Sequence, residues 1–253
     1  MGNLFKQLKI YLQNIYIFLR GKINPSKIVE GKEIPIIINN YNRLSTLKKL
    51  IDSLMQRGYA NIYIIDNQST YPPLLQYYTE CPFPVFKLKE NLGFKALWKS
   101  DLRKKFCTDY YIYTDSDVVP ADYCPGDFID YFLKILKERP FARKAGFSLR
   151  IDNLPDRYNN KEKVVQWENQ FYKKPVNDKL YRAPIDTTFA LYRPYAGLSR
   201  SRYVETYRTA YPYQAEHLPW YVDTNNMSEE EKYYISHCTQ KTGWSEITLA
   251  DKK

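Results

Sequence analysis

One stretch decides the fold prediction: Tyr110-Tyr111-Ile112-Tyr113-Thr114-Asp115-Ser116-Asp117-Val118-Val119-Pro120. Its aromatic, β-favouring first half predicts a buried strand, and two carboxylates, Asp115 and Asp117, follow at the carboxyl end. Like charges this close repel unless a cation or several donors compensate, so the pair indicates a site for a divalent metal or a polyhydroxyl ligand. The alternative is a surface turn, where Asp and Ser are ordinary residues. On this stretch alone both interpretations stay open.

Composition narrows the class of protein. With 253 residues the chain is long enough for one α/β domain. Its net charge of +10 suits nucleic acid, an anionic membrane surface or an anionic small substrate, and charge alone does not choose among them. The four cysteines form no Cys-x-x-Cys pair, which argues against a zinc knuckle or a redox motif and predicts a reduced, cytoplasmic chain.

Residues 1–30 predict a basic amphipathic helix. Its apolar positions recur at helical spacing and lysines and an arginine surround them. The apolar set is Leu4, Leu8, Tyr11, Leu12, Ile15, Phe18 and Leu19, and the cations are Lys6, Lys9, Arg20 and Lys22. No run reaches the length of a spanning helix. The segment either lies on an anionic bilayer or packs against the domain, and we favour peripheral contact of residues 1–25 with the inner face of the cell membrane.

From residue 34 the chain alternates strands and helices. Residues 34–38, 61–65 and 85–88 predict strands, and residues 44–54 trace one face of a helix that Gly58 ends. Each strand is followed by a polar segment, and the segments are Asn39-Asn40-Tyr41-Asn42-Arg43, Asp66-Asn67-Gln68-Ser69-Thr70 and Glu90-Asn91-Leu92-Gly93-Phe94. This order predicts a parallel sheet with one polar edge, the candidate active face.

Beyond Pro120 the pattern is looser. Residues 128–136 and 164–171 predict helices, and residues 145–151 and 187–192 predict strands. Residues 216–223 mix acids, a histidine and aromatics and are expected to form a loop. Ser228, with Glu231 three residues later, predicts the capped start of a last helix that runs to about Cys238.

The ordered polar segments, ending in Asp115-Ser116-Asp117, resemble the amino-terminal half of family 2 glycosyltransferases. The resemblance covers residues 34–120 well and the later half only in outline. It implies an α/β fold of the GT-A type, nucleotide-diphospho-sugar transferase-like, with a mostly parallel central sheet flanked by helices. Residues 31–253 would then be a single domain, with a nucleotide-binding half at 31–120 and an acceptor-binding half at 121–253.

The same resemblance implies a nucleotide-sugar donor, a UDP-sugar being favoured, and a saccharide or glycolipid acceptor. The residues that would contact the donor nucleoside are Asn40, Tyr41, Asp66, Asn91, Gly93 and Lys95. Asp115 and Asp117 look like the family's Asp-x-Asp pair, the first facing the ribose or a metal-bound water and the second binding the metal. A hard ion, Mn²⁺ or Mg²⁺, suits these carboxylates and stabilises the charge on a departing diphosphate.

The general base is the point of departure from the family. Members commonly carry a Glu-Asp pair after the acceptor-binding strand, and here the comparable place holds Glu216-His217. Either residue could be the base, His217 could be a metal ligand, or His217 could only pack beside Trp220. Asp186 and Asp223 are the remaining candidates for the base. If the family's usual chemistry holds, the transfer inverts the anomeric configuration.

Two other classes compete with this interpretation. Haloacid-dehalogenase-like phosphatases also use Asp-x-Asp at a strand end, but near the start of the domain and with Gly after the second acid, where this chain has Val118. A basic nucleic-acid-binding protein would account for the charge, but no nucleic-acid motif accompanies it, so we expect no nucleic-acid partner. This chain also lacks the glycine-rich loop of a dinucleotide-binding dehydrogenase and that of a sugar nucleotidyltransferase.

Overall fold

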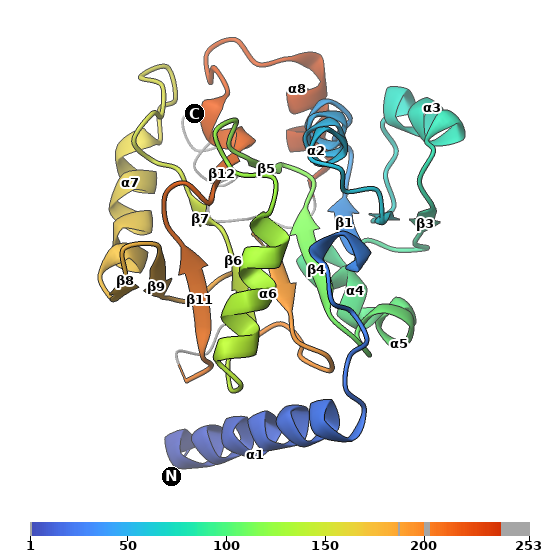
Figure 1. The fold of residues 1–253 in the computed structure, drawn as a ribbon. Helices are drawn as coiled ribbons and strands as arrows, with labels where there is room; N and C mark the ends of the chain where they lie inside the picture. The colour runs from blue at the N-terminus through green and yellow to red at the C-terminus, as the bar shows by residue number, and fades with distance from the viewer. Residues whose placement is uncertain (1, 187, 200–202, 239–253) are drawn as a thin grey trace.

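The computed structural model describes residues 2–186, 188–199 and 203–238 of the chain. Within these ranges a central sheet of nine strands forms, in the order β3-β2-β1-β4-β10-β6-β11-β9-β8 (Figure 1). Its strands are β1 (Ile36–Asn40), β2 (Ile62–Asp66), β3 (Val85–Lys87), β4 (Tyr111–Asp115), β6 (Lys144–Gly146), β8 (Pro175–Asn177), β9 (Leu180–Arg182), β10 (Ala190–Tyr192) and β11 (Thr206–Thr209).

The first four strands of the order are parallel, as the sequence predicts. β1 pairs with β2 and β4 in one register, so that Asn40 lies opposite Asp66 and Asn39 opposite Asp115. The isoleucine-rich strand β1 is buried along its whole length, which is typical of a parallel strand covered on both faces. Because parallel strands end at the same edge, the polar residues after β1, β2 and β4 gather there.

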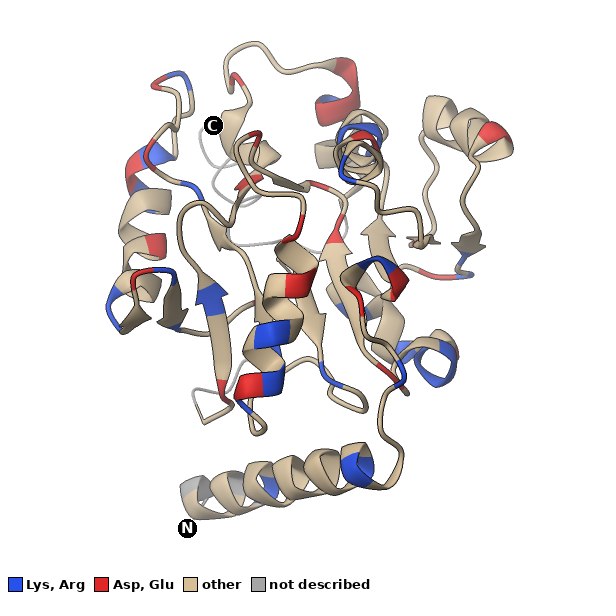
Figure 2. Cartoon of the chain, viewed as in Figure 1, with Lys and Arg blue, Asp and Glu red and all other residues tan. Residues whose placement is uncertain are grey.

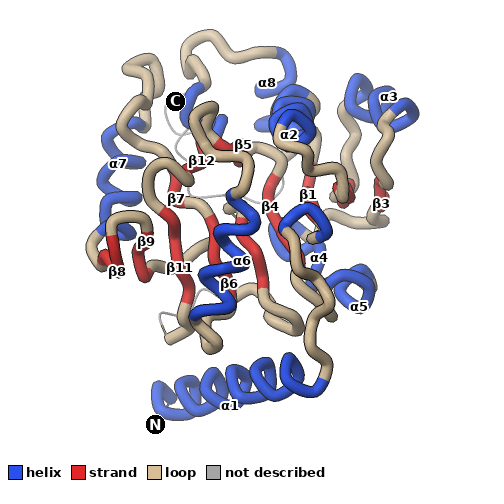
Figure 3. Tube along the Cα trace, viewed as in Figure 1, coloured by secondary structure: helices blue, strands red, loops and turns tan. Residues whose placement is uncertain are grey.

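Helices cover both faces of this sheet. One face packs against α2 (Ser45–Gln56), α3 (Pro72–Glu80) and α6 (Phe128–Glu138), and the other packs against α4 (Ala96–Lys99) and α5 (Leu102–Phe106). Figure 3 shows α6 lying across the middle strands, α4 behind the sheet near β4, and α5 farther to the right. The prediction of an α/β fold with a central sheet flanked by helices is confirmed. Apolar residues Ala96, Leu97, Leu102 and Phe106 suggest one helix in the sequence, and the structure has two short helices there.

The sheet is mixed rather than mostly parallel. β10 runs antiparallel to both β4 and β6, while β6 and β11 are parallel and the pairs at the β9 end are antiparallel. The strand predicted over residues 145–151 is interrupted at Phe147, whose amide donates to the carbonyl of Phe189 at 3.1 Å. Its second part, β7 (Ser148–Leu149), joins a separate sheet.

That second sheet corrects the prediction for residues 216–223. Its order is β5-β12-β7, where β5 is Val118–Pro120 and β12 is Gln214–His217. The segment predicted as a loop is therefore the end of a strand, followed by a 3₁₀ turn over Leu218–Tyr221. Gln214–His217 holds no β-branched residue, so the strand depends on its partners β5 and β7 rather than on local propensity.

Two helices lie at opposite ends of the sheet (Figure 1). α1 (Gly2–Ile23) lies below the amino-terminal ends of β4 and β6, and α8 (Glu229–His237) lies above the carboxyl ends of β1 and β4. Both helices are predicted from sequence, as is α7 (Lys161–Asn169). None of the described helices combines the length and apolar character needed to cross a bilayer.

Candidate active site

Polar side chains meet at the carboxyl ends of β1, β2 and β4. Asn39 donates from Nδ2 to Asp115 Oδ1 at 3.3 Å, which links the ends of β1 and β4. On the α3 side of the sheet, Asn40 donates to the hydroxyl of Tyr78 at 2.8 Å, and Tyr78 donates to Asp66 Oδ1 at 3.3 Å. The register thus assembles Asn40, Asp66 and Asp115, all predicted site residues, along one edge.

Asp66 is the most enclosed of these acids, with 3% of its surface exposed. Burial raises the pKa of its carboxyl above the ordinary value, while hydrogen bonds from Ser69 and Tyr78 and the charge of Lys87 oppose that rise. The amide of Ser69 donates to Asp66 Oδ1 at 3.3 Å. The carboxylate is therefore held in one orientation by groups of its own domain.

Asparagine side chains fix the loops that frame this edge. Asn42, at a left-handed φ of 51°, accepts from the amides of Thr70 and Tyr71 at 2.7 and 2.9 Å and so ties the loop after β1 to the loop after β2. Asn67 donates to the carbonyl of Gly93 at 3.0 Å and accepts from the amide of Leu92 at 2.7 Å. The three polar segments predicted from sequence are thus one hydrogen-bonded unit.

Asp117 and His217 face each other beside this unit. β12 pairs antiparallel with β5, His217 lies opposite Val118, and the amide of Leu218 donates to the carbonyl of Asp117 at 2.9 Å. His217 Nε2 consequently lies 3.7 Å from Asp117 Oδ1. Burial lowers the pKa of His217, the charge of Asp117 opposes this, and Arg43 adds to it. A neutral imidazole at pH 7 follows from the balance.

Arg43 supplies a buried cation to the same cluster. Its Nε lies 3.9 Å from Asp117 Oδ2, and its two terminal nitrogens donate to Glu231 of α8 at 2.7 and 3.0 Å. Its guanidinium also stacks on the ring of Tyr234, 3.9 Å from the centroid. Only 7% of the Arg43 side chain is exposed, so Asp117 and Glu231 together compensate one enclosed positive charge.

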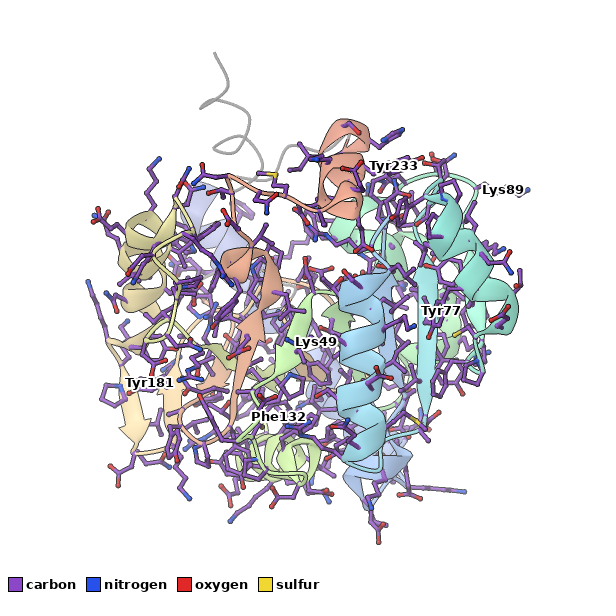
Figure 4. The ribbon with its side chains drawn as sticks, turned by 90° about the horizontal axis from the view of Figure 1, so that it is seen from above. Lys49, Tyr77, Lys89, Phe132, Tyr181 and Tyr233 are labelled. Carbon is purple, nitrogen blue, oxygen red and sulfur yellow. The ribbon has the colours of Figure 1, made fainter. Side chains whose placement is uncertain are left out.

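α8 covers the edge through polar contacts. Glu230 accepts from the amide and hydroxyl of Ser45, Tyr233 donates to the carbonyl of Thr70 at 3.1 Å, and Tyr41 donates to the carbonyl of His237 at 2.8 Å. Seen from above, Tyr233 lies on the side of α8 that faces α3 (Figure 4). None of the residues of α8 is buried, so these bonds rather than an apolar core hold the helix.

Of the three predicted metal ligands, Asp117 and His217 lie close together in the structure, and Asp115 lies apart from them. Among the described residues no three or more His, Cys, Asp or Glu side chains are grouped to hold a metal ion. Asp117 Oδ1 is buried without a hydrogen-bond partner in this part of the chain, and it faces the imidazole Nε2 of His217. An oxygen and a nitrogen donor suit Mn²⁺, with its other positions left to diphosphate and water. Asp115 instead accepts a hydrogen bond from Asn39.

The four candidates for the base fall in different places. Glu216 and His217 point to opposite faces of β12, and Glu216 pairs with Arg150 at 3.6 Å and with Asn153 at 3.2 Å, away from His217. Asp223 accepts from the amide of Asn225 at 2.9 Å in the turn that follows the 3₁₀ segment.

Asp186 lies in the segment before β10. The exposed Asp186 stands four residues before β10, and its carbonyl accepts from Lys144 Nζ at 2.9 Å. Burial, then the charges of Asp186 and Asp115, raises the pKa of Tyr192 well above its ordinary value, which ties both carboxylates to one buried ring. Of the four candidates, His217 is the one that the described structure places against an acid of the Asp115–Asp117 pair.

The other residues predicted to contact the nucleoside are Tyr41, Asn91, Gly93 and Lys95, and Tyr41 is the one with a described contact to α8. Tyr41 contacts Tyr234 edge-on, with ring centroids 6.2 Å apart. Asn91 accepts from the amide of Gly93 at 2.9 Å, and Gly93 adopts a left-handed φ of 64° that a side chain would strain. Lys95 lies over the ring of Phe94, 5.3 Å from its centroid. These residues therefore border the edge without meeting Asp117.

Sequence reasoning missed the partners of Arg43. Arg43 itself stands in the first polar segment, but its contacts Glu231 and Tyr234 are almost 190 positions later, and no local pattern signals that distance. A cavity of about 520 Å³ lies beside α2, with Ser45, Arg57 and Asp122 in its lining, and none of the predicted site residues lines it. The candidate site is thus a covered edge rather than this cavity.

In the view of Figure 2 the described charged residues of both signs are mixed. Figure 2 shows lysines, arginines and acids interspersed over the helices, with a run of acids at the start of α8 above the sheet. Those acids are Glu229, Glu230 and Glu231, and the last two bind Ser45 and Arg43. In this view the described lysines and arginines are therefore interspersed with acids.

No protein-family model matches the chain, and no curated protein matches it. Among solved structures, S. aureus TarS has 12% identity and a TM-score of 0.41, over 86% of this chain and 42% of that one. GalNAc-T7, solved with UDP, GalNAc and Mn²⁺, has 14% identity and a TM-score of 0.40 over 64% of this chain and 35% of that one. A cytidylyltransferase from Leptospira borgpetersenii has 12% identity and a TM-score of 0.33, over 55% and 72%. The chain spans less than half the length of the first two. These likenesses are weak, so the activity must be argued from the residues themselves.

Proposed function

We propose that the chain is a glycosyltransferase that moves a sugar from a nucleotide-sugar donor, a UDP-sugar being favoured, to a hydroxyl of a saccharide or glycolipid acceptor. The observation that carries the proposal is the pair Asp117 and His217, whose Oδ1 and Nε2 face each other at 3.7 Å beside the carboxyl ends of parallel strands. Asp115 precedes Asp117 by two positions at the end of β4. Asn40 and Asp66 lie opposite each other at the ends of the neighbouring strands β1 and β2. In α/β sheets this edge is where ligands bind.

The donor nucleoside would lie over β1 and β2. Asn39 Oδ1 and Asn40 Oδ1 are buried acceptors without hydrogen-bond partners among the described residues, so both are suited to N–H and O–H donors of a base or ribose. Asp66 would accept from the base, and Tyr41 offers a ring for stacking. Because α8 bonds to Tyr41 and to the loop at Thr70, donor entry requires that helix to shift.

Asp117 and His217 are the residues that would hold Mn²⁺ or Mg²⁺. A bound divalent ion would neutralise the charge that builds on the departing diphosphate. The chain's own contribution is to keep the His217 imidazole neutral by burial and to orient Asp117 through the backbone bond from Leu218. Arg43, fixed beside Asp117, would bring a positive charge near a diphosphate bound at this pair.

Asp186, in the segment before β10, is the base that we favour. Its carboxylate would take the proton from the acceptor hydroxyl while the hydroxyl oxygen bonds to the anomeric carbon and the carbon–oxygen bond to the diphosphate breaks. Attack from the face opposite the diphosphate inverts the configuration. Glu216 is less suited, because it faces away from His217 and is paired with Arg150.

Thermal unfolding with a panel of nucleoside diphosphates, each with and without Mn²⁺, tests the donor site. We expect one diphosphate, UDP first, to raise the melting temperature only when Mn²⁺ is present. A ligand at a hundred times its dissociation constant stabilises the fold by about 2.7 kcal/mol, which such a measurement resolves. Asp117→Asn should abolish the shift and stay folded.

Glu162→Gln is the matched control, because Glu162 is an exposed acid on α7 and should leave the shift unchanged. If no diphosphate stabilises the folded wild type, or if Asp117→Asn keeps the full shift, the proposal is wrong. Salt-sensitive binding of DNA or RNA that Asp117→Asn leaves intact would instead favour a nucleic-acid-binding protein.

A further inference from the structure

We propose that the outer face of α1 docks on an anionic bilayer surface. Eight large apolar side chains of this helix are exposed by half or more, and they recur at three- and four-residue spacing along one face. They are Leu4 (73%), Phe5 (70%), Leu8 (52%), Tyr11 (63%), Leu12 (56%), Tyr16 (54%), Leu19 (50%) and Ile23 (70%). At 1.5 Å per residue the face from Leu4 to Ile23 is about 30 Å long, so it is one continuous apolar surface rather than a few scattered leucines.

The opposite face of α1 is anchored to the domain. Ile10 and Ile17 are buried, and Phe18 packs on Phe141 with ring centroids 5.5 Å apart. Arg143 donates to Asn14 Oδ1 at 2.7 Å and to the carbonyl of Ile10 at 3.3 Å. The domain therefore uses one side of the helix and leaves the other to a partner. A helix with two apolar faces needs two partners.

Charge identifies an anionic surface as the second partner. The helix carries no acidic residue, while Lys9 and Lys22 are exposed and Arg20 lies in the last turn. Figure 2 shows basic and no acidic positions on the described part of α1. An apolar face with cations beside it matches lipid chains below anionic headgroups. If two copies of the chain paired through α1, the positive charges of the two helices would repel each other. A second copy is therefore a less suitable partner for this face than an anionic surface.

Vesicle flotation with the full chain tests this surface. The wild type should float with vesicles of phosphatidylglycerol and phosphatidylcholine and much less with phosphatidylcholine alone. Leu8→Ser with Leu12→Ser and Leu19→Ser should weaken binding at least tenfold, since it removes apolar groups already exposed in the free protein. Lys9→Gln with Lys22→Gln should weaken binding to anionic vesicles about 25-fold, roughly fivefold for each charge.

The matched control is Met55→Ser with Val176→Ser and Tyr211→Ser, three apolar residues exposed by 48%, 39% and 67% on the domain. It should float like the wild type, and all variants should melt at the same temperature. Failure of the wild type to float, or equal loss in the control, overturns the proposal. A wild-type dimer in sedimentation velocity that the leucine variant abolishes, without vesicle binding, would assign the face to a second copy instead.

Discussion

Substitution of Asp66 tests both the stability of the fold and the proposed binding of the donor. Burial raises its pKa, so in the native state the charged form is disfavoured and the stability of the fold falls as the pH rises from about 4 through that raised pKa. Asp66→Asn removes this penalty. We expect the variant to be about 1 kcal/mol more stable than the wild type at pH 7 and to lose nucleoside diphosphate binding.

Chemical denaturation at pH 4 and pH 7 measures this effect. The stability difference between Asp66→Asn and the wild type should be small at pH 4 and should grow as the pH rises. Asp156→Asn is the control, because Asp156 is an exposed surface partner of Lys161 and its pKa is lowered rather than raised. A variant less stable than the wild type at pH 7 would mean that the hydrogen bonds from Ser69 and Tyr78 require the charge.

The site residues that the sequence predicts correctly are those at the carboxyl ends of strands. Asn40, Asp66 and Asp115 end β1, β2 and β4, and a parallel sheet necessarily gathers them. His217 could be suspected as a rare histidine, but its position opposite Val118 depends on strand pairing across about a hundred residues. Glu216 shows the limit: adjacent in sequence to His217, it points the other way because side chains alternate along a strand.

Among the secondary-structure elements, α8 is the one whose attachment can be tested. Glu231→Gln removes the carboxylate that binds Arg43 at 2.7 and 3.0 Å and leaves that guanidinium with Asp117 alone. We expect the docking of α8 to weaken by about 1.4 kcal/mol, hence tenfold faster amide exchange over residues 229–237, with α6 unchanged. Hydrogen–deuterium exchange measured by mass spectrometry gives both values.

Glu229→Gln on the same helix is the control. The side chain of Glu229 is 87% exposed and pairs with Lys232 on the surface. Amide exchange over α8 in this variant should therefore match that in the wild type. Equal exchange in all three proteins would show that the bonds of Glu230, Tyr233 and Tyr41 suffice to hold the helix.

Elements with a strong local signal were predicted, and those made by pairing were not. α2 has five buried residues on one face and Gly58, at a φ of 79°, just past its end, so periodicity and turn chemistry agree. The start of α8 was predicted from Ser228, whose hydroxyl accepts from the amide of Glu231 at 3.2 Å. β8, β9, β11 and β12 have at most four residues each, too few for a period to show.

In the whole molecule, the helix that would bind a bilayer and the edge that would bind the donor lie at opposite ends of the sheet. α1 contacts Arg143, just before β6 begins, and Arg20 lies over Tyr195, three residues after Tyr192, which pairs with Tyr111 at the start of β4. Asp115 ends the same strand at the other side. A chain lying on a membrane through α1 would thus turn its catalytic edge toward the solvent (Figure 1).

This orientation predicts that membrane binding leaves the donor site accessible. We expect the affinity for UDP with Mn²⁺, measured by isothermal titration calorimetry, to change less than about twofold when the protein is saturated with anionic vesicles, because no lipid would approach Asp117. Protein and vesicles are equilibrated at the same free Mn²⁺ concentration, since anionic headgroups bind the ion. Asp117→Asn with vesicles gives the background. A tenfold loss of affinity on vesicles would mean that the carboxyl edge faces the bilayer. Undiminished affinity would favour an acceptor hydroxyl carried away from the surface, as at the end of a long saccharide, over one at the headgroup.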